Sequence, residues 1–385
     1  MNDARRWLAE GVDLALEATV ALSFSRVGYQ VRRRLFEWPD LAGVAATTDS
    51  LVTSGSSDAP DRPGAERALA GRVVLVTGAT SGLGRSVATQ LAALGATVVV
   101  AGRDPERTRR VRTDLVAATG NRAVHDVVAD LARLDDVIDL AATVSADHPR
   151  LDALVHNAGA LVHDFTRTVD GLELTVQTHV VAPFLLTRQL FGLLAATPSS
   201  RVVTVASGGM YTQRLADLDL GPDDFDGVTA YAKSKRAQVV LTQQWARRTA
   251  GRGVTFHAMH PGWVDTPGLA ASLPQFHRVM GPWLRSPDQG GDTIAWLAVA
   301  PEAGAGGGRP GQEAGGRFWL DRHHRWVDKL PWTATSDEAA DRLWRWVSDQ
   351  ADRRGGDLHD LHDLHGLDES DAGDIPEGPR LRMED

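Results

Sequence analysis

The sequence predicts an α/β protein whose core is a doubly wound parallel sheet of about seven strands with helices on both faces. Short apolar runs alternate with helix-like blocks between residues 71 and 350, which is typical of a parallel sheet covered on both sides. A glycine-rich turn joins the first apolar run to the first helix-like block, as expected at the start of such a sheet. Right-handed crossovers between the strands would then place ligands at the carboxyl ends of the strands.

The individual elements follow from local periodicity. Apolar runs that are short enough to be buried strands occupy residues 72–76, 97–101, 124–129, 153–156, 201–206, 254–259 and 317–320. Helical patterns between them cover residues 83–94, 105–118, 134–147, 172–194, 228–250 and 288–298.

The two ends of the chain differ in composition from the middle. We expect an N-terminal amphipathic helix in residues 1–42, a disordered linker in 43–70, the sheet domain in 71–350 and a disordered tail in 351–385. The tail is strongly acidic and contains His359, His362 and His365. These histidines could take up a metal adventitiously, but no functional metal site is predicted, because a mobile tail preorganises no ligands.

The N-terminal helix is predicted from apolar residues spaced by three or four between Leu8 and Leu35, and it should end at Trp38-Pro39. Two roles are open for it. It packs on the body of the protein or on a partner subunit, or residues 8–38 make peripheral contact with a membrane. The second role rests on Arg26 and the run 32–34 beside two aromatic residues.

Composition excludes several classes of function. The formal net charge of −9 argues against a nucleic-acid partner, because phosphate affinity requires clustered Lys and Arg. The absence of Cys excludes disulfides, thiolate metal sites and cysteine nucleophiles. No uncharged apolar run reaches 18 residues and no secretory signal is recognised, so we expect a cytoplasmic protein, membrane-peripheral if the helix binds lipid. The preference for Arg over Lys and the many Gly residues suggest a bacterial source.

The glycine-rich turn points to a dinucleotide. In a strand–turn–helix context, glycines permit a tight turn and let the backbone approach a pyrophosphate at the helix N-terminus, as in a Rossmann sheet. Arg103 follows the second strand where an acid commonly binds the ribose, so NADP(H) is preferred over NAD(H), unless Arg103 only faces solvent. The turn residues expected at the cofactor are Gly78, Thr80, Ser81, Gly82, Leu83 and Gly84.

Further residues at strand ends fit the same ligand. Asp130 and Leu131 follow the third strand, where an acid can accept a hydrogen bond from the adenine amino group. The small residues after the fourth strand would let the chain pass beneath the nicotinamide ribose; they are Asn157, Ala158 and Gly159.

Three residues predict the chemistry. Ser207 follows the fifth strand, and Tyr231 and Lys235 are four residues apart, so the last two share one face of a helix. A lysine near a tyrosine should lower the pKa of the phenol, and such a proton donor suits a carbonyl that receives hydride. The alternatives are a turn serine and a surface Tyr–Lys pair.

Taken together, these motifs resemble the short-chain dehydrogenase/reductase family over about residues 71–346. Within that family the chain is similar to the dehydrogenase/reductase member-twelve group in residues 201–210, 259–268 and 284–293. The resemblance implies that Tyr231 is the general acid/base, Ser207 binds the substrate oxygen, and Lys235 holds the nicotinamide ribose. It also implies that Pro261, Gly262, Val264 and Thr266 border the nicotinamide.

One departure concerns a proton relay. The family usually has an Asn in the helix after the fourth strand, and in this chain Thr178 takes that place. Thr can still bind a water, so Thr178 is included among the candidate catalytic residues. The family also often forms oligomers, which makes a homo-oligomer a further expectation.

The segment after Pro261-Gly262 suggests the substrate. It is rich in apolar residues from Trp263 to Trp283, which either line the substrate site or pack as a lid. The first reading predicts a small lipophilic aldehyde or ketone, or the matching alcohol. We therefore expect an NADP(H)-dependent oxidoreductase acting as a carbonyl reductase. The alternative is a non-catalytic dinucleotide-binding or membrane-recruited interaction protein.

Overall fold

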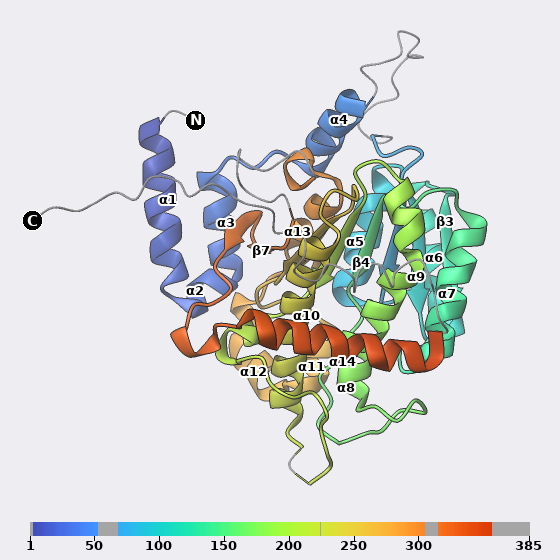
Figure 1. Ribbon diagram of the computed structural model, residues 1–385. Helices are drawn as coiled ribbons and strands as arrows, with labels where there is room; N and C mark the ends of the chain where they lie inside the picture. Colours follow the sequence, from blue (N-terminus) through green and yellow to red (C-terminus); the bar gives the residue numbers. More distant parts are fainter. Residues whose placement is uncertain (1–2, 53–67, 224, 305–314, 356–385) are drawn as a thin grey trace, which may run out of the picture.

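A twisted sheet runs through the centre of the protein (Figure 1). The computed structural model describes residues 3–52, 68–223, 225–304 and 315–355. Within these ranges eight strands form one sheet in the order β3-β2-β1-β4-β5-β6-β7-β8. The sequence order reverses between β1 and β4, and doubly wound sheets bind their ligands at the carboxyl ends of the strands at such a switch point. The strands are β1 Val73–Thr77, β2 Thr97–Gly102, β3 Val124–Val128, β4 Ala153–His156, β5 Arg201–Val205, β6 Thr255–Met259, β7 Arg317–Leu320 and β8 His323–Arg325.

Helices cover both faces of this sheet, which confirms the predicted fold class. Alternate residues of β1 point to opposite sides: Val74 and Val76 pack in one apolar cluster, and Val73 and Leu75 pack in another. The first cluster is covered by α5 Gly82–Ala93, α6 Pro105–Thr119 and α13 Pro287–Val299. The second is covered by α7 Leu134–Asp147, α9 Ala182–Ala196, α10 Gly227–Arg248 and α14 Asp337–Gly355.

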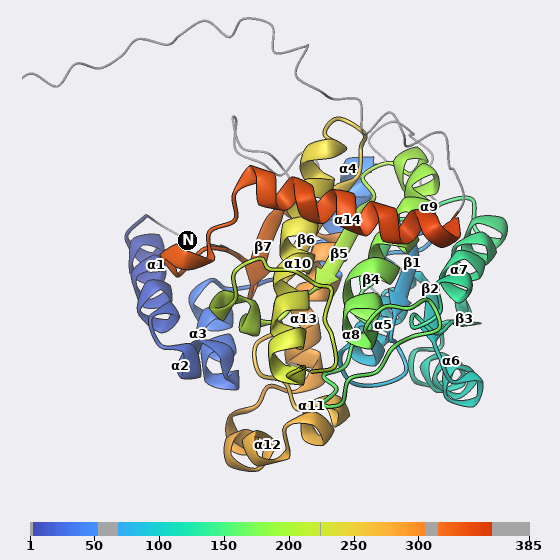
Figure 2. The same cartoon turned by 60° about the horizontal axis from the view of Figure 1, so that its bottom comes forward.

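The last helix crosses the outside of the second layer (Figure 2). Trp344 of α14 packs edge-on against Phe184 of α9 and Trp245 of α10, with ring centroids 4.9 Å apart in both pairs. The helix continues to Gly355, beyond residue 350 where we expected the tail to begin. The rest of the predicted acidic tail, with its three histidines, lies outside the described residues.

The N-terminal region differs from the prediction of one continuous helix. It forms α1 Asp3–Glu17, α2 Val20–Phe24 and α3 Arg26–Leu35, packed beside the β7–β8 edge (Figure 1). The chain turns sharply at Ser25, whose side chain accepts a hydrogen bond from the Val27 amide and so begins α3. Gly28 permits the turn, because a Cβ there would lie 2.4 Å from the carbonyl oxygen of Leu22.

The start of the predicted linker is also helical. α4 Leu41–Val52 lies beside α13, and its Val44 and Ala45 are buried in the first apolar cluster. Packing against α13 thus orders residues that lack a periodic apolar face of their own. Residues 53–67 of the predicted linker lie outside the described ranges.

The remaining elements are one long apolar helical segment and several short helices and turns. The segment Leu174–Ala196 is long and apolar enough to span a membrane, but 67% of its apolar window is buried in the fold, which is typical of a core helix. It comprises α8 Leu174–Val176, a π-helical turn at Gln177–Val181, and α9. Short helices α11 Pro267–Ser272 and α12 Pro274–Met280 follow β6, and single 3-10 turns occupy Gly208–Thr212, Gly281–Trp283, Pro301–Ala303 and Pro331–Thr333.

Candidate active site

The glycine-rich turn between β1 and α5 lies tightly against the chain that follows β4. Gly78 has a φ of 64°, a left-handed conformation that favours glycine, and a Cβ there would lie 2.7 Å from the Ala158 Cα. The Asn157 side-chain amide donates to the carbonyl oxygen of Thr77 at 2.9 Å and to that of Gly78 at 3.2 Å. A Cβ on Gly84 would collide with the same amide at 2.4 Å. The predicted residues Asn157 and Ala158 therefore pack directly against the glycine-rich turn.

The segment that follows β6 reaches the same turn. A Cβ on Gly82 would lie 3.2 Å from Cγ2 of Thr266, so Thr266 stands beside the start of α5. Val264 and Leu83 meet over Gly290, where a Cβ would lie 2.5 Å and 2.7 Å from their methyl groups. The structure thus brings together the glycine turn and the predicted nicotinamide segment.

The end of β2 presents an unpartnered cation. Arg103 is exposed and makes no side-chain hydrogen bond or ion pair among the described residues. The neighbouring Asp104 accepts a hydrogen bond from the Arg107 amide at 2.8 Å and caps α6, so its carboxylate is directed at the helix. A Cβ on Gly102 would lie 2.4 Å from a methyl carbon of Thr80, so there is no room for a side chain at the end of β2.

The acid after β3 has a local partner. The Asp130 carboxylate accepts from the Ala132 amide at 3.0 Å and is half-buried, whereas Leu131 is buried against α7. The structure therefore places these two residues at the carboxyl edge of the sheet, next to the end of β2.

Ser207, Tyr231 and Lys235 come together at the end of β5. Ser207 begins a 3-10 turn; its Oγ accepts from the Gly209 amide at 3.3 Å and lies within reach of the Tyr231 hydroxyl. Lys235 is 3% exposed; its Nζ donates to the Val205 carbonyl oxygen at 3.0 Å and lies 5.4 Å from the centroid of the Tyr231 ring. One turn of α10 thus carries a phenol and an amine next to a hydroxyl from the sheet.

The pKa of Tyr231 shifts in the direction opposite to our expectation. Burial raises the pKa of Tyr231, and the hydrogen bond from Ser207 only partly offsets this effect. Burial also lowers the pKa of Lys235 to about 7, so the amine has lost its charge at the higher pH where a phenol would ionise. Tyr231 is therefore a neutral phenol at neutral pH, the form that can donate a proton.

Thr178, predicted as the relay residue, is half-buried, and its side chain makes no hydrogen bond among the described residues. The next residue, His179, is buried; its Nε2 accepts from the Ala160 amide at 3.1 Å. His179 Nδ1 must then carry the proton, and it donates to Ser234 Oγ at 2.8 Å. Ser234 Oγ in turn donates to the Tyr231 carbonyl oxygen at 2.7 Å.

His179 is thus the residue that the helix after β4 presents to Tyr231, with ring centroids 5.5 Å apart. Burial holds the pKa of His179 well below its usual range, so its ring is neutral. A Cβ on Gly159 would lie 2.6 Å from His179 Nε2, which explains the glycine there. The π-helical turn Gln177–Val181, which contains His179, is seen only in the structure, and the sequence carried no local signal for it.

A doubly wound sheet with this glycine turn, and with Ser, Tyr and Lys at the carboxyl end of β5, defines a nicotinamide-dinucleotide-dependent oxidoreductase. Comparison with known proteins agrees. The short chain dehydrogenase family profile matches residues 72–275. The chain belongs to the short-chain dehydrogenase/reductase family, as its motifs predicted.

Individual relatives extend this comparison. Dehydrogenase/reductase SDR family member 12 of Bos taurus is 37% identical over 302 residues, which cover 78% of this chain and 91% of the relative. Polyprenol dehydrogenase of Mus musculus is 39% identical over 287 residues, covering 71% of this chain and 82% of the relative. Both are mammalian proteins, and the bacterial source stays a prediction.

Solved structures share the fold. A short chain dehydrogenase from Shigella flexneri complexed with NADP superposes with a TM-score of 0.52 at 25% identity. The superposition covers 67% of this chain and all of the other chain. In this protein Gly78 and Gly84 let the turn pack closely on Ala158 and Asn157 at the N-terminus of α5, which is where a doubly wound sheet binds a dinucleotide pyrophosphate.

Proposed function

We propose that this protein is an NADP(H)-dependent carbonyl reductase that acts on a lipophilic aldehyde or ketone, or on the matching alcohol in reverse. The observation that carries the proposal is that Ser207, Tyr231 and buried Lys235 come together at the end of β5, with Lys235 Nζ 5.4 Å from the centroid of the Tyr231 ring. Bound NADPH supplies the hydride that the carbonyl carbon receives. Tyr231 donates its hydroxyl proton to the carbonyl oxygen, and Ser207 holds that oxygen by a hydrogen bond. Lys235, in the fraction that is protonated near its pKa of about 7, stabilises the phenolate left behind.

The cofactor preference rests on the end of β2. Asp104 is engaged in capping α6, and the free, exposed Arg103 is suited to bind a ribose 2′-phosphate. The residues proposed to hold the dinucleotide are those of the glycine turn, Asp130 and Leu131, Asn157 to Gly159, Lys235, and the segment from Pro261 to Thr266.

The substrate class rests on the segment that follows β6. Trp263 and Phe276 of α12 pack edge-on at 5.2 Å, and Val279 and Trp283 are exposed beside them. An apolar rim of this kind favours an apolar substrate. Mouse polyprenol dehydrogenase, which the chain resembles, is named for a lipophilic alcohol.

The test is NADPH oxidation with a series of straight-chain aldehydes from propanal to decanal, followed by absorbance. Tyr231→Phe removes one hydroxyl and should reduce turnover by about 100-fold or more, while NADPH still binds. Full activity of Tyr231→Phe on a substrate that the wild type reduces would overturn the assigned proton donor.

The cofactor preference has its own variant. Arg103→Ala should weaken NADPH binding by about 1–3 kcal/mol, because a charged hydrogen bond to phosphate is lost, and it should leave NADH binding unchanged. Titration of both cofactors, followed by fluorescence, measures the two affinities. Equal binding of NADH and NADPH by the wild type would contradict the preference.

A second proposal is peripheral membrane contact by a cytoplasmic protein. Leu14, Val20 and Leu22 are exposed on α1 and α2, and Arg26 is exposed next to them. Phe36 and Trp38 pack on His323 with ring centroids 4.0 and 6.1 Å apart, so the two aromatic side chains that first suggested the contact face the protein. Sedimentation with anionic liposomes, with Leu14, Val20 and Leu22 replaced by Ser as the control, tests the contact.

A further inference from the structure

A single buried guanidinium joins three distant parts of the chain. Arg285 is 1% exposed; its Nε donates to the Phe24 carbonyl oxygen at 2.9 Å, and its Nη1 donates to the Pro261 carbonyl oxygen at 3.1 Å. Its Nη2 donates to Asp321 at 2.9 Å. The Trp263 amide donates to the same Phe24 oxygen at 2.8 Å. The α2–α3 junction, the loop after β6 and the β7–β8 turn are therefore hydrogen-bonded together.

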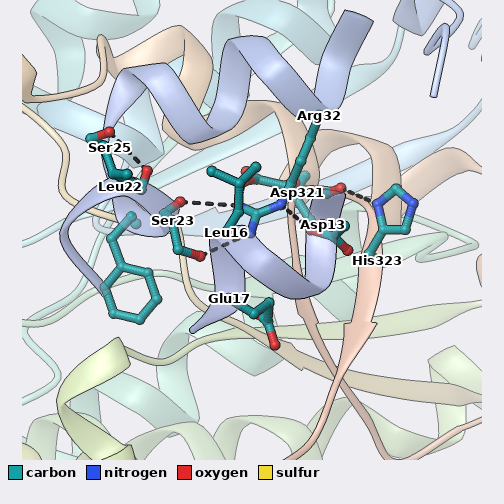
Figure 3. Close-up of polar contacts among 12 residues, drawn as sticks. Asp13, Leu16, Glu17, Leu22, Ser23, Ser25, Arg32, Asp321 and His323 are labelled. Carbon is teal, nitrogen blue, oxygen red and sulfur yellow. Dashed lines mark hydrogen bonds and ion pairs between the residues drawn. The ribbon is translucent and has the colours of Figure 1, made fainter. Parts of the chain in front are cut away.

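A second buried arginine completes this network (Figure 3). Arg32 is fully buried and donates to the Ser23 carbonyl oxygen at 3.0 Å, to Asp13 at 2.5 Å and to Asp321 at 2.7 Å. Burial alone would raise the pKa of Asp321, but the guanidiniums of Arg285 and Arg32 outweigh it and hold this pKa below its usual range. The carboxylate stays charged and fixes α3 to the β7–β8 turn.

The side chain of Phe24 touches both loops that border the candidate site. Its ring is 6% exposed and lies against Gly208, where a Cβ would be 2.5 Å from the ring carbon Cε2. It also packs edge-on against Trp263 with ring centroids 5.9 Å apart. Gly208 directly follows Ser207, and Trp263 follows Pro261-Gly262.

We propose that Phe24 is a positioning residue of the active site, and that α1–α3 are part of the catalytic unit. Its ring holds the Ser207–Gly208 turn at a fixed separation from the Pro261–Trp263 loop, while its carbonyl oxygen anchors the Trp263 amide. The inference rests on the proposed function, in which these two loops border the substrate and the nicotinamide. A merely structural role would give the N-terminal helices packing energy and no influence on the two loops.

The first test compares Phe24→Ala with Phe191→Ala in the full chain. Phe191 is 5% exposed and stacks on Trp245 on the α9 side of the sheet, so its truncation removes a similar amount of buried ring. Phe24→Ala should speed hydrogen exchange of the Trp263 amide about tenfold and weaken NADPH binding about fivefold. Phe191→Ala should change both by less than about twofold, although it lowers the melting temperature by a similar amount.

Equal behaviour of the two variants would overturn the inference. The amide exchange of Trp263 decides the positioning role even without cofactor. Failure of the wild type to bind NADPH or NADH would instead overturn the proposed function, so the two failures are distinguishable.

A second arm uses Gly208 and remains informative if Phe24→Ala does not fold. Gly208→Ala places a methyl group into the Phe24 ring and should weaken NADPH binding by about fivefold or more. Phe24→Leu vacates that space while keeping apolar bulk, so the double variant Phe24→Leu/Gly208→Ala should recover most of the loss. Additive losses in the double variant would show that the ring does not position the Ser207 turn.

Discussion

Two groups of buried polar residues in this protein respond to burial in opposite ways. In the network of Arg32, Asp321 and Arg285, opposite charges outweigh burial and keep the carboxylate ionised. In the group of Tyr231, Lys235 and His179, burial dominates and favours the neutral form of each residue. In this protein, buried charged groups that have partners of opposite charge connect parts of the fold. Buried titratable groups that lack such partners are largely neutral and are available for proton transfer.

The cause lies in the partners. Asp321 accepts hydrogen bonds from both guanidiniums, which themselves bind main-chain carbonyl groups. Lys235 donates to the Val205 carbonyl oxygen and has no carboxylate partner within the described residues. A bound dinucleotide is the partner that we propose for it.

The largest expected change in stability comes from disrupting the network of Arg32, Asp321 and Arg285. Asp321→Asn leaves the buried Arg285 without a counter-charge and leaves Arg32 with Asp13 alone, and it should lower the free energy of unfolding by about 3–5 kcal/mol. Asn tolerates the left-handed backbone at this position, where φ is 55°, so the loss reports charge rather than strain. Urea unfolding measures it; a loss below about 1 kcal/mol would show that the network does not anchor α3.

The next effect should have the opposite sign. Lys235→Met removes an uncompensated buried amine and should raise the free energy of unfolding at pH 7 by about 2–4 kcal/mol while abolishing turnover. The native pKa is about 7 and lies below that of the unfolded chain, so the unfolded chain binds more protons between pH 7 and about 10. Wild-type stability should therefore rise with pH across this window and approach that of the variant. A destabilised Lys235→Met at pH 7 would contradict the comparison.

The smallest effect concerns how Tyr231 is held. Ser234→Ala removes the hydroxyl that links His179 to the Tyr231 carbonyl oxygen and should cost about 1–2 kcal/mol of stability and several-fold in turnover. Thr178→Val is the matched control and should change either quantity by less than about 0.5 kcal/mol. A larger effect of Thr178→Val than of Ser234→Ala would restore Thr178 as the relay residue.

Most of the sheet could be predicted because seven strands are short apolar runs whose burial is visible in their composition. β8 could not, because His323–Arg325 is short and polar. Its hairpin turn also lacks the glycine that usually marks such a turn. Asp321 and Arg322 adopt the left-handed conformation instead, with φ of 55° and 56°, and each makes a buried ion pair.

The sequence predicts the site residues whose type is determined by chemistry. It does not predict the residues whose place depends on packing. The structure brings the predicted Ser207, Tyr231 and Lys235 together, since a four-residue spacing implies one helix face. The relay role of Thr178 stays a prediction: its side chain makes no hydrogen bond among the described residues, whereas the adjacent His179 faces Tyr231. Phe24 carries no chemical signature at all, and its place depends on contacts with residues more than 180 positions away.

The pairing of Arg32 with Asp321 also has a consequence for synthesis. The two residues are 289 positions apart, so at about 5–20 residues per second Arg32 leaves the ribosome roughly 15–60 s before its partner is made. During this time the nascent helices lack the carboxylate that holds α3. Helices α1–α3 are translated before the sheet but are therefore among the last elements to reach their native place, and Phe24 can pack beside Ser207 stably only once β7 and the β7–β8 turn have emerged.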